Sequence, residues 1–141
     1  SYYLTGRCSD AVAAYEKALK LSPGSDAVLN NYAYLCVDCL KDSKKALPSA
    51  RLAVQLKPTR GEYLDTLALV LIAEKQFQEG LDYADRAGKF ADSASVQLHR
   101  AMALHGLNRD PAAREALTAA SAMNPDPPTK ASIAELLSTL K

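Results

Sequence analysis

The sequence predicts an all-α solenoid, in which pairs of helices repeat along the chain and stack on one another. Small, apolar and proline positions recur at spacings of 33 to 35 residues, the length of a helix pair with its turns. Within the units, apolar residues recur every three to four residues, as on one face of a helix. No stretch shows the sustained alternation of a strand. The repeat therefore decides the fold class.

Four columns of similar residues mark the second helix of each unit. Two columns are small, one is large and apolar, and one is proline except at Asp92. All four have successive spacings of 35, 34 and 33 residues. The columns are Ala11, Ala46, Gly80 and Ala113; Ala18, Ala53, Ala87 and Ala120; Leu21, Leu56, Phe90 and Met123; and Pro23, Pro58, Asp92 and Pro125.

A second set of columns lies upstream and marks the first helix of each unit. The distance between the two sets varies from eight to ten residues, and the variation falls in the stretches 38–43 and 106–110, which are polar or contain glycine. Because insertions are tolerated in turns, each unit is predicted to be helix, turn, helix, turn. The columns are Leu29, Leu64 and Leu98; Leu35, Val70 and Leu104; Ala33, Ala68 and Met102; and, more loosely, Tyr2, Cys36, Leu71 and His105.

Capping residues and prolines set the boundaries of the earlier helices. Ser9 and Ser43 are predicted to cap the helices at 9–21 and 44–56, since a serine oxygen can accept from the free N–H groups of a first turn. Proline cannot continue a helix, so one follows each of these helices shortly after its end. Pro48 predicts a kink, or a start delayed toward Lys45. The first helices of the first two complete units are predicted at 26–39 and 60–74.

The later helices are supported by local patterns. Apolar residues at helical spacing support 77–89, the first-helix columns place 94–107, and Asp110 followed by Pro111 begins 111–123. The last segment shows no repeat. Its helix at 129–140 has one apolar stripe, which suits a terminal helix that shields the last core. The stripe consists of Ile133, Leu136, Leu137 and Leu140.

The columns resemble the tetratricopeptide repeat. The segment 2–23, YYLTGRCSDAVAAYEKALKLSP, is similar to the second half of that repeat, and the terminal proline recurs. The departures are Met102 at a small position, Asp92 in place of a proline, and the absence of Trp. The resemblance implies a right-handed superhelix with a partial repeat at 1–25, repeats at 26–60, 61–94 and 95–127, and a capping helix at 128–141. The runs 30–35 and 64–67 are similar to bacterial members of secretion and exopolysaccharide systems.

Composition argues against several classes of function. The chain has 141 residues and a net charge of +1, without the basic excess that nucleic-acid binding uses. The longest apolar run, 67–73, is too short to span a membrane. No targeting segment occurs in this chain, and the compartment is left open between cytoplasm and bacterial periplasm. A start in mid-unit predicts a fragment or a processed product.

The residues that could carry chemistry do not form a catalytic set. His99 and His105 are six residues apart, so they point away from each other on a helix, and His105 is expected to pack in the core. Cys36 and Cys39 form a CxxC late in a helix, which is not where a redox motif lies, and a chain of this size does not need disulfides. The cysteines are therefore expected to be packing residues. We expect no enzyme, no metal and no cofactor.

The resemblance implies that the first helix of each unit lines a concave groove. The expected function is a non-catalytic scaffold that binds a peptide or protein there. The alternatives are an assembly segment that stacks or self-associates, and a regulatory domain of an enzyme whose catalytic part lies outside this chain. The candidate ligand-binding residues are Asn30, Asn31, Tyr34, Asp38, Glu62, Asp65, Thr66, Leu69, Ile72, His99 and Arg100.

Two expectations concern the ligand of this groove. Chaperone-binding members of the family hold a carboxylate with Lys and Arg, whereas this chain has Glu62 and Thr66 at the matching places, so that clamp is expected to be absent. Asp65 and Arg100 are expected to orient a ligand, with its basic end near Asp65 and its acidic end near Arg100.

Overall fold

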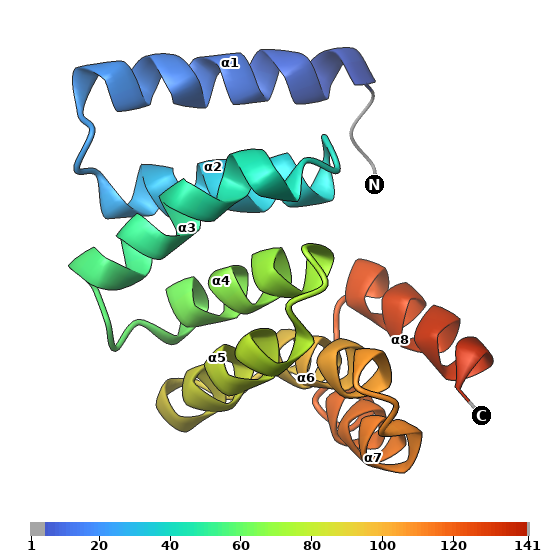
Figure 1. The fold of residues 1–141 in the computed structure, drawn as a ribbon. Helices are drawn as coiled ribbons and strands as arrows, with labels where there is room; N and C mark the ends of the chain where they lie inside the picture. The colour runs from blue at the N-terminus through green and yellow to red at the C-terminus, as the bar shows by residue number, and fades with distance from the viewer. Residues whose placement is uncertain (1–4, 141) are drawn as a thin grey trace.

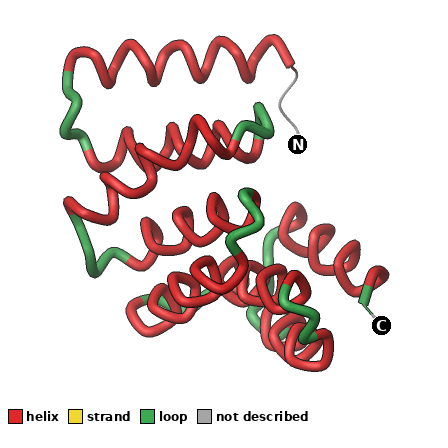
Figure 2. Tube along the Cα trace, in the orientation of Figure 1, coloured by secondary structure: helices red, strands yellow, loops and turns green. Residues whose placement is uncertain are grey.

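The computed structural model describes residues 5–140, and this part of the chain is a row of α-helices joined by short turns (Figures 1 and 2). It contains no strand. The all-α prediction is confirmed. The helices are α1 (Thr5–Leu21), α2 (Asp26–Asp38), α3 (Ser43–Leu56), α4 (Gly61–Ala73), α5 (Phe77–Phe90), α6 (Ala94–Gly106), α7 (Asp110–Ser121) and α8 (Pro127–Thr139).

Most helix boundaries match the prediction to within two residues, but the first two serine caps are wrong. Ser9 lies inside α1, which begins four residues earlier than predicted. Asp42 caps α3 by accepting from the backbone N–H of Lys45 at 3.1 Å, while Ser43 donates to Glu74 at 2.7 Å. α3 runs through Pro48 from Ser43, so its start is not delayed.

The packing of the helices explains why one face is concave. The first helices of successive units contact each other, α2 with α4 and α4 with α6. Among the described residues, the second helices α3, α5 and α7 make no such contacts with one another. The row therefore curves with α2, α4 and α6 on its inner side. α1 is a second helix that packs on α2, and α8 packs on α6 and α7 (Figure 1).

The two small columns lie where helices approach closely. In α3, α5 and α7 every member is buried. At Gly80 an added Cβ would lie 2.8 Å from Cγ1 of Ile72 on α4, so a side chain would force the neighbour to move. In α1 the corresponding Ala11 and Ala18 are only half-buried. The small residues are therefore required by helix contacts, as the columns predict.

Substitution by leucine at the small column should measure this requirement. We expect Ala53→Leu and Ala87→Leu each to lower the unfolding free energy by about 1–3 kcal/mol, because both sites are fully packed. Urea denaturation followed by circular dichroism gives the values. Ala134→Leu on α8 is the control, since Ala134 is exposed. Equal stability of all three variants would show that the small columns do not mark helix contacts.

The large apolar column is exposed rather than packed. Its members lie at the ends of the second helices, and their exposed fractions run from 39% to 81%. These four residues, called the exposed row below, lie at or just after the C-terminal ends of α1, α3, α5 and α7. The row consists of Leu21, Leu56, Phe90 and Met123.

The structure shifts the alignment of the third complete unit by one residue. Ala101 and Leu104 are buried at the places predicted for Met102 and His105, which are only half-buried. From Leu104 to Ala113 is nine residues, the same distance as in the preceding unit, so the predicted deletion disappears. His105 lies at the end of α6, where its Nδ1 pairs with Asp110 at 2.8 Å. Its expected place in the core is wrong.

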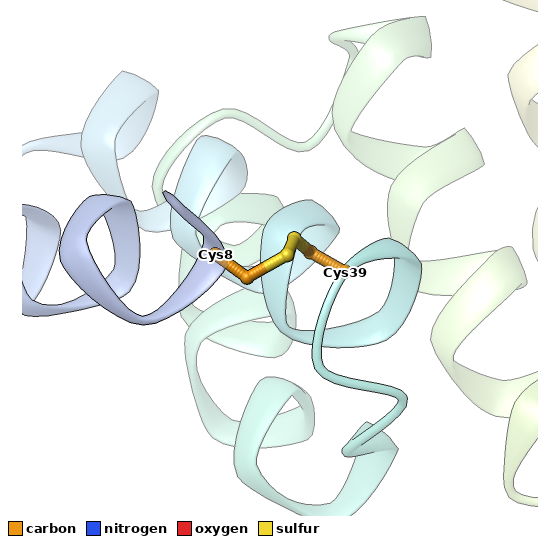
Figure 3. Close-up of a disulfide and its surroundings, with 2 residues drawn as sticks. All are labelled: Cys8 and Cys39. Atoms are coloured by element: carbon orange, nitrogen blue, oxygen red, sulfur yellow. A yellow bond between two sulfur atoms is a disulfide. The ribbon is translucent and has the colours of Figure 1, made fainter. Parts of the chain in front are cut away.

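A disulfide joins the first two helices. It links Cys8, in α1, to Cys39, which follows α2, and their Cα atoms are 5.7 Å apart (Figure 3). The expectation that Cys36 and Cys39 are both packing thiols is therefore wrong for Cys39. Cys36 remains a buried free thiol. The antiparallel packing of α1 on α2 brings together two cysteines that are 31 residues apart in the chain.

Glu16 connects α1 to both helices of the next unit. Its carboxylate accepts from the hydroxyl of Tyr32 at 2.8 Å and lies 3.0 Å from Nζ of Lys45. The hydrogen bond from Lys45, and then that from Tyr32, hold the pKa of Glu16 below its ordinary value of 4.5. The folded chain therefore prefers the ionised carboxylate.

This preference predicts a pH dependence of stability. A lowered pKa contributes stability above the ordinary value of 4.5, and that contribution is lost as the pH falls through the lower folded value. We expect the unfolding free energy, measured by urea denaturation at several pH values, to fall less for Glu16→Gln than for the parent between neutral and acidic pH. Glu115→Gln, an exposed site on α7, is the control and should follow the parent. Parallel curves for the parent and Glu16→Gln would contradict the role of Glu16.

Candidate ligand-binding groove

A groove with a volume of about 660 Å³ lies on the inner side of the solenoid. Ligand sites in proteins commonly have volumes in the range of roughly 300–1,000 Å³. Residues of α2, α4, α6 and α8 line it, together with Lys41 in the turn after α2 and Ser43 at the start of α3. They are Tyr34, Val37, Asp38, Lys41, Ser43, Leu69, Ala73, Ser95, Leu98, His99, Met102, Pro128, Thr129, Ser132, Glu135, Leu136 and Thr139.

The repeat explains why these side chains meet. Tyr34, Leu69, Met102 and Glu135 all line the groove, and successive members are 35, 33 and 33 residues apart. The last spacing shows that α8 continues the register of the first helices. α8 buries Ile133, as a terminal helix would, and it also forms one wall of the groove.

Four of the eleven predicted site residues line the groove. Tyr34 is 44% exposed, and Leu69 is half-buried. These two supply an aromatic and an aliphatic contact surface on neighbouring helices. The four residues are Tyr34, Asp38, Leu69 and His99.

Three predicted site residues are buried and do not line the groove. Ile72 packs against Gly80, and the hydroxyl of Thr66 donates to the carbonyl of Glu62 at 3.1 Å. Asn30 is 4% exposed, and its Nδ2 donates to Oε1 of Glu62 at 3.5 Å. These residues belong to the packing of the helices, and the Asn30 contact joins α2 to α4.

The remaining predicted residues do not line the groove. Asn31 and Glu62 are exposed outside its lining. Arg100 donates from Nε to Asp85 on α5 at 2.7 Å, outside the groove. The alignment shift explains this position, because the groove positions of α6 belong to residues one place earlier than Arg100 and its predicted neighbours.

Asp65 is held by two residues of α6. One carboxylate oxygen lies 2.6 Å from Nδ1 of His99, and the other accepts from the hydroxyl of Ser95 at 2.7 Å. His99 is largely buried but lines the groove. Nδ1 of His99 is therefore engaged by Asp65. The expected orientation of a ligand between Asp65 and Arg100 gets no support from these positions.

Sequence reasoning missed groove residues on α6, where the alignment shifts by one residue, and on α8, which was expected only to shield the core. On α6 these are Ser95, Leu98 and Met102, which the 33-residue spacing from α4 would have found. Carrying the same spacing one unit further leads to α8. The α8 residues are Pro128, Thr129, Ser132, Glu135, Leu136 and Thr139; Lys41 and Ser43, in the insertion after α2, were also missed.

The described residues offer neither a metal cluster nor a membrane span. Nowhere in 5–140 do three or more His, Cys, Asp or Glu side chains come together in a way that would hold a metal ion. Within the same range, none of the helices combines the length and the apolar character needed to cross a bilayer.

Comparison with solved structures identifies the fold. A thermophilic tetratricopeptide-repeat protein of Thermus thermophilus superimposes with a TM-score of 0.81 at 22% identity, over 93% of this chain and 73% of its own. The tetratricopeptide-repeat fold is therefore the fold of this chain. A tetratricopeptide-repeat protein of Parabacteroides merdae gives a TM-score of 0.74 at 20% identity, over 93% of this chain and 52% of its own.

A third similar structure is MamA of Desulfovibrio magneticus, with a TM-score of 0.73 at 20% identity, over 84% of this chain and 67% of its own. No family model and no curated protein sequence matches the chain. The similarity to tetratricopeptide-repeat proteins of secretion and exopolysaccharide systems stays a prediction. In this tetratricopeptide-repeat solenoid, the groove occupies the inner face formed by the first helices and α8.

Proposed function

We propose that this chain is a non-catalytic interaction scaffold that binds a peptide or protein segment in the groove between α2, α4, α6 and α8. The observation that carries the proposal is an open groove with a partly exposed apolar surface and polar walls. Tyr34 and Leu69 provide that surface from adjacent helices. Aromatic and apolar groups at the centre of a contact supply most of its energy.

The polar lining suits an extended peptide. Ser132, Thr129 and His99 offer hydroxyl and ring nitrogen groups along two walls. Such groups can pair with the N–H and C=O groups of a peptide backbone whatever its sequence. A continuous ligand can reach all of them, because the lining residues come from successive helices.

A structural or assembly role is the second candidate. It is favoured by the exposed row of Leu21, Leu56, Phe90 and Met123, whose members lie at or just after the ends of the second helices. This row is outside the groove lining. The two candidates therefore use different surfaces and can be separated by substitution.

Affinity capture from an extract of the source organism tests the proposal. The immobilised chain is compared with Tyr34→Ala in the groove and with Phe90→Ala in the exposed row. We expect Tyr34→Ala to lose specific partners and Phe90→Ala to retain them, with melting temperatures close to that of the parent. If Phe90→Ala loses partners and Tyr34→Ala retains them, the assembly role is favoured instead.

A further inference from the structure

The groove contains charged side chains that the described residues leave unpaired. Asp38, Lys41 and Glu135 line it, and none of them makes an ion pair or a side-chain hydrogen bond within residues 5–140. Asp38 is half-buried. Because no donor of the described residues pairs with its carboxylate, that group can accept hydrogen bonds from a ligand.

The position of Asp38 is also unfavourable for its own helix. It is the last residue of α2, where the helix dipole is negative. An acidic residue there weakens the helix, and no cation of the described chain compensates it. Residues that break a local rule in this way are expected at functional sites.

The two carboxylates lie on separate walls. Asp38 ends α2 and Glu135 is on α8, and these two helices are not in contact, so the groove lies between them. Carboxylates accept hydrogen bonds and do not donate them, so a ligand must bring the donors. A cation in the groove would be attracted from both walls.

The alternative of an acidic ligand has little support. Lys41 is the one lysine or arginine among the lining residues, and it is exposed. Arg100 is paired with Asp85 outside the groove, and His99 already faces Asp65. A carboxylate ligand would meet two unpaired like charges and one unpaired cation.

The apolar part of the groove lies within the same lining. Leu69, Met102 and Leu136 come from three different helices. Methionine adapts its shape to different side chains, so this surface can accept apolar groups of several sizes. A ligand is therefore expected to combine an apolar side chain with a cation.

We propose that the groove binds a peptide segment in which an apolar side chain stands beside a lysine or arginine. The apolar group packs on Leu69 and Met102, and the cation is held by Asp38 and Glu135. This assignment rests on the proposed function of the same groove and adds the chemistry of the partner.

A random peptide library displayed on phage, selected on the immobilised chain, gives the probes. The selected sequences are then synthesised with a fluorescent label, each with a counterpart in which glutamate replaces lysine and arginine. We expect selection of lysine or arginine beside an apolar residue, and loss of binding by the glutamate counterparts. Fluorescence anisotropy measures the dissociation constants.

Charge variants give the sharper test. Asp38→Asn with Glu135→Gln should weaken binding of the selected peptides by about three- to tenfold, whereas Lys41→Gln, the matched control of opposite sign, should strengthen it. Asp38→Asn alone should not lower the melting temperature, because it removes a negative charge from a helix C-terminus. A purely structural role for Asp38 would give the reverse pattern, lower stability with unchanged binding.

The outcomes separate this inference from the proposed function. If peptides bind and compete for the groove but are acidic or uncharged, the assignment of a basic ligand is wrong and the groove remains a binding site. If no peptide is selected, or if binding is unaffected when Ser132→Trp fills the groove, both the proposed function and the inference fail.

Discussion

Loss of the Cys8–Cys39 disulfide is expected to lower the unfolding free energy by about 3–4 kcal/mol, from the chain-entropy cost of closing a loop of this length. The disulfide closes a loop between residues 31 apart. It also fixes α1, which among the described helices packs on α2 and reaches α3 through the ion pair between Glu16 and Lys45. Urea denaturation of the oxidised chain, the reduced chain and Cys8→Ser measures the difference. The last two should agree.

Counting thiols provides the control for this prediction. Burial raises the pKa of the Cys36 thiol, which keeps it protonated and a poor nucleophile, so it should not exchange with the neighbouring disulfide. The unfolded, unreduced chain should therefore show one free thiol, and the unfolded, reduced chain should show all three. Cys36→Ala should remain sensitive to reductant. Three free thiols without reductant would contradict the pairing.

Filling the groove is expected to reduce peptide binding tenfold or more, a loss of at least about 1.4 kcal/mol of binding free energy. Ser132 is exposed on the α8 wall, so Ser132→Trp places a large side chain in the groove without disturbing the core. Binding of peptides selected on the parent chain is followed by fluorescence anisotropy.

The same helix provides a matched control for this substitution. Ser138 is also exposed on α8 but does not line the groove. Ser138→Trp should bind the peptides as the parent does, and both variants should melt near the parent temperature. If both tryptophan variants bind the peptides as the parent does, the peptides bind outside the groove and the proposed function is wrong.

The fold was predictable because its determinants are local and repeated. Each unit needs small residues where its two helices approach, and the columns at Ala46, Gly80 and Ala113 record that need in sequence. The helix ends follow from prolines such as Pro58, which bar continuation. None of these signals depends on contacts between distant parts of the chain.

The groove was harder to predict because its lining depends on aligning α6 with the earlier first helices to within one residue. In the third complete unit, Leu98 and Leu104 match Leu64 and Val70 of the preceding unit in one alignment. In another alignment, Ala101 matches Ala68. Only burial decides between them, since Ala101 is fully packed and Met102 is not. That one-residue error placed Arg100 in the groove.

The disulfide and the groove wall formed by α8 could not be predicted without knowing which helices pack on one another. The nearby pair Cys36 and Cys39 attracts attention in the sequence, but the antiparallel packing of α1 on α2 pairs Cys39 with Cys8 instead. On α8, Ser132 and Glu135 differ in type from their counterparts in earlier units, so only their spacing reveals the shared position.

The central claim is that the inner groove is the binding surface of this solenoid. Amide chemical shifts of the isotope-labelled chain, recorded during titration with a selected peptide, test it most directly. We predict that the shifts with the largest changes belong to groove residues of α2, α4, α6 and α8, with Tyr34, Leu69 and Ser132 among them. Changes confined to the exposed row of Leu21, Leu56, Phe90 and Met123 would contradict the claim.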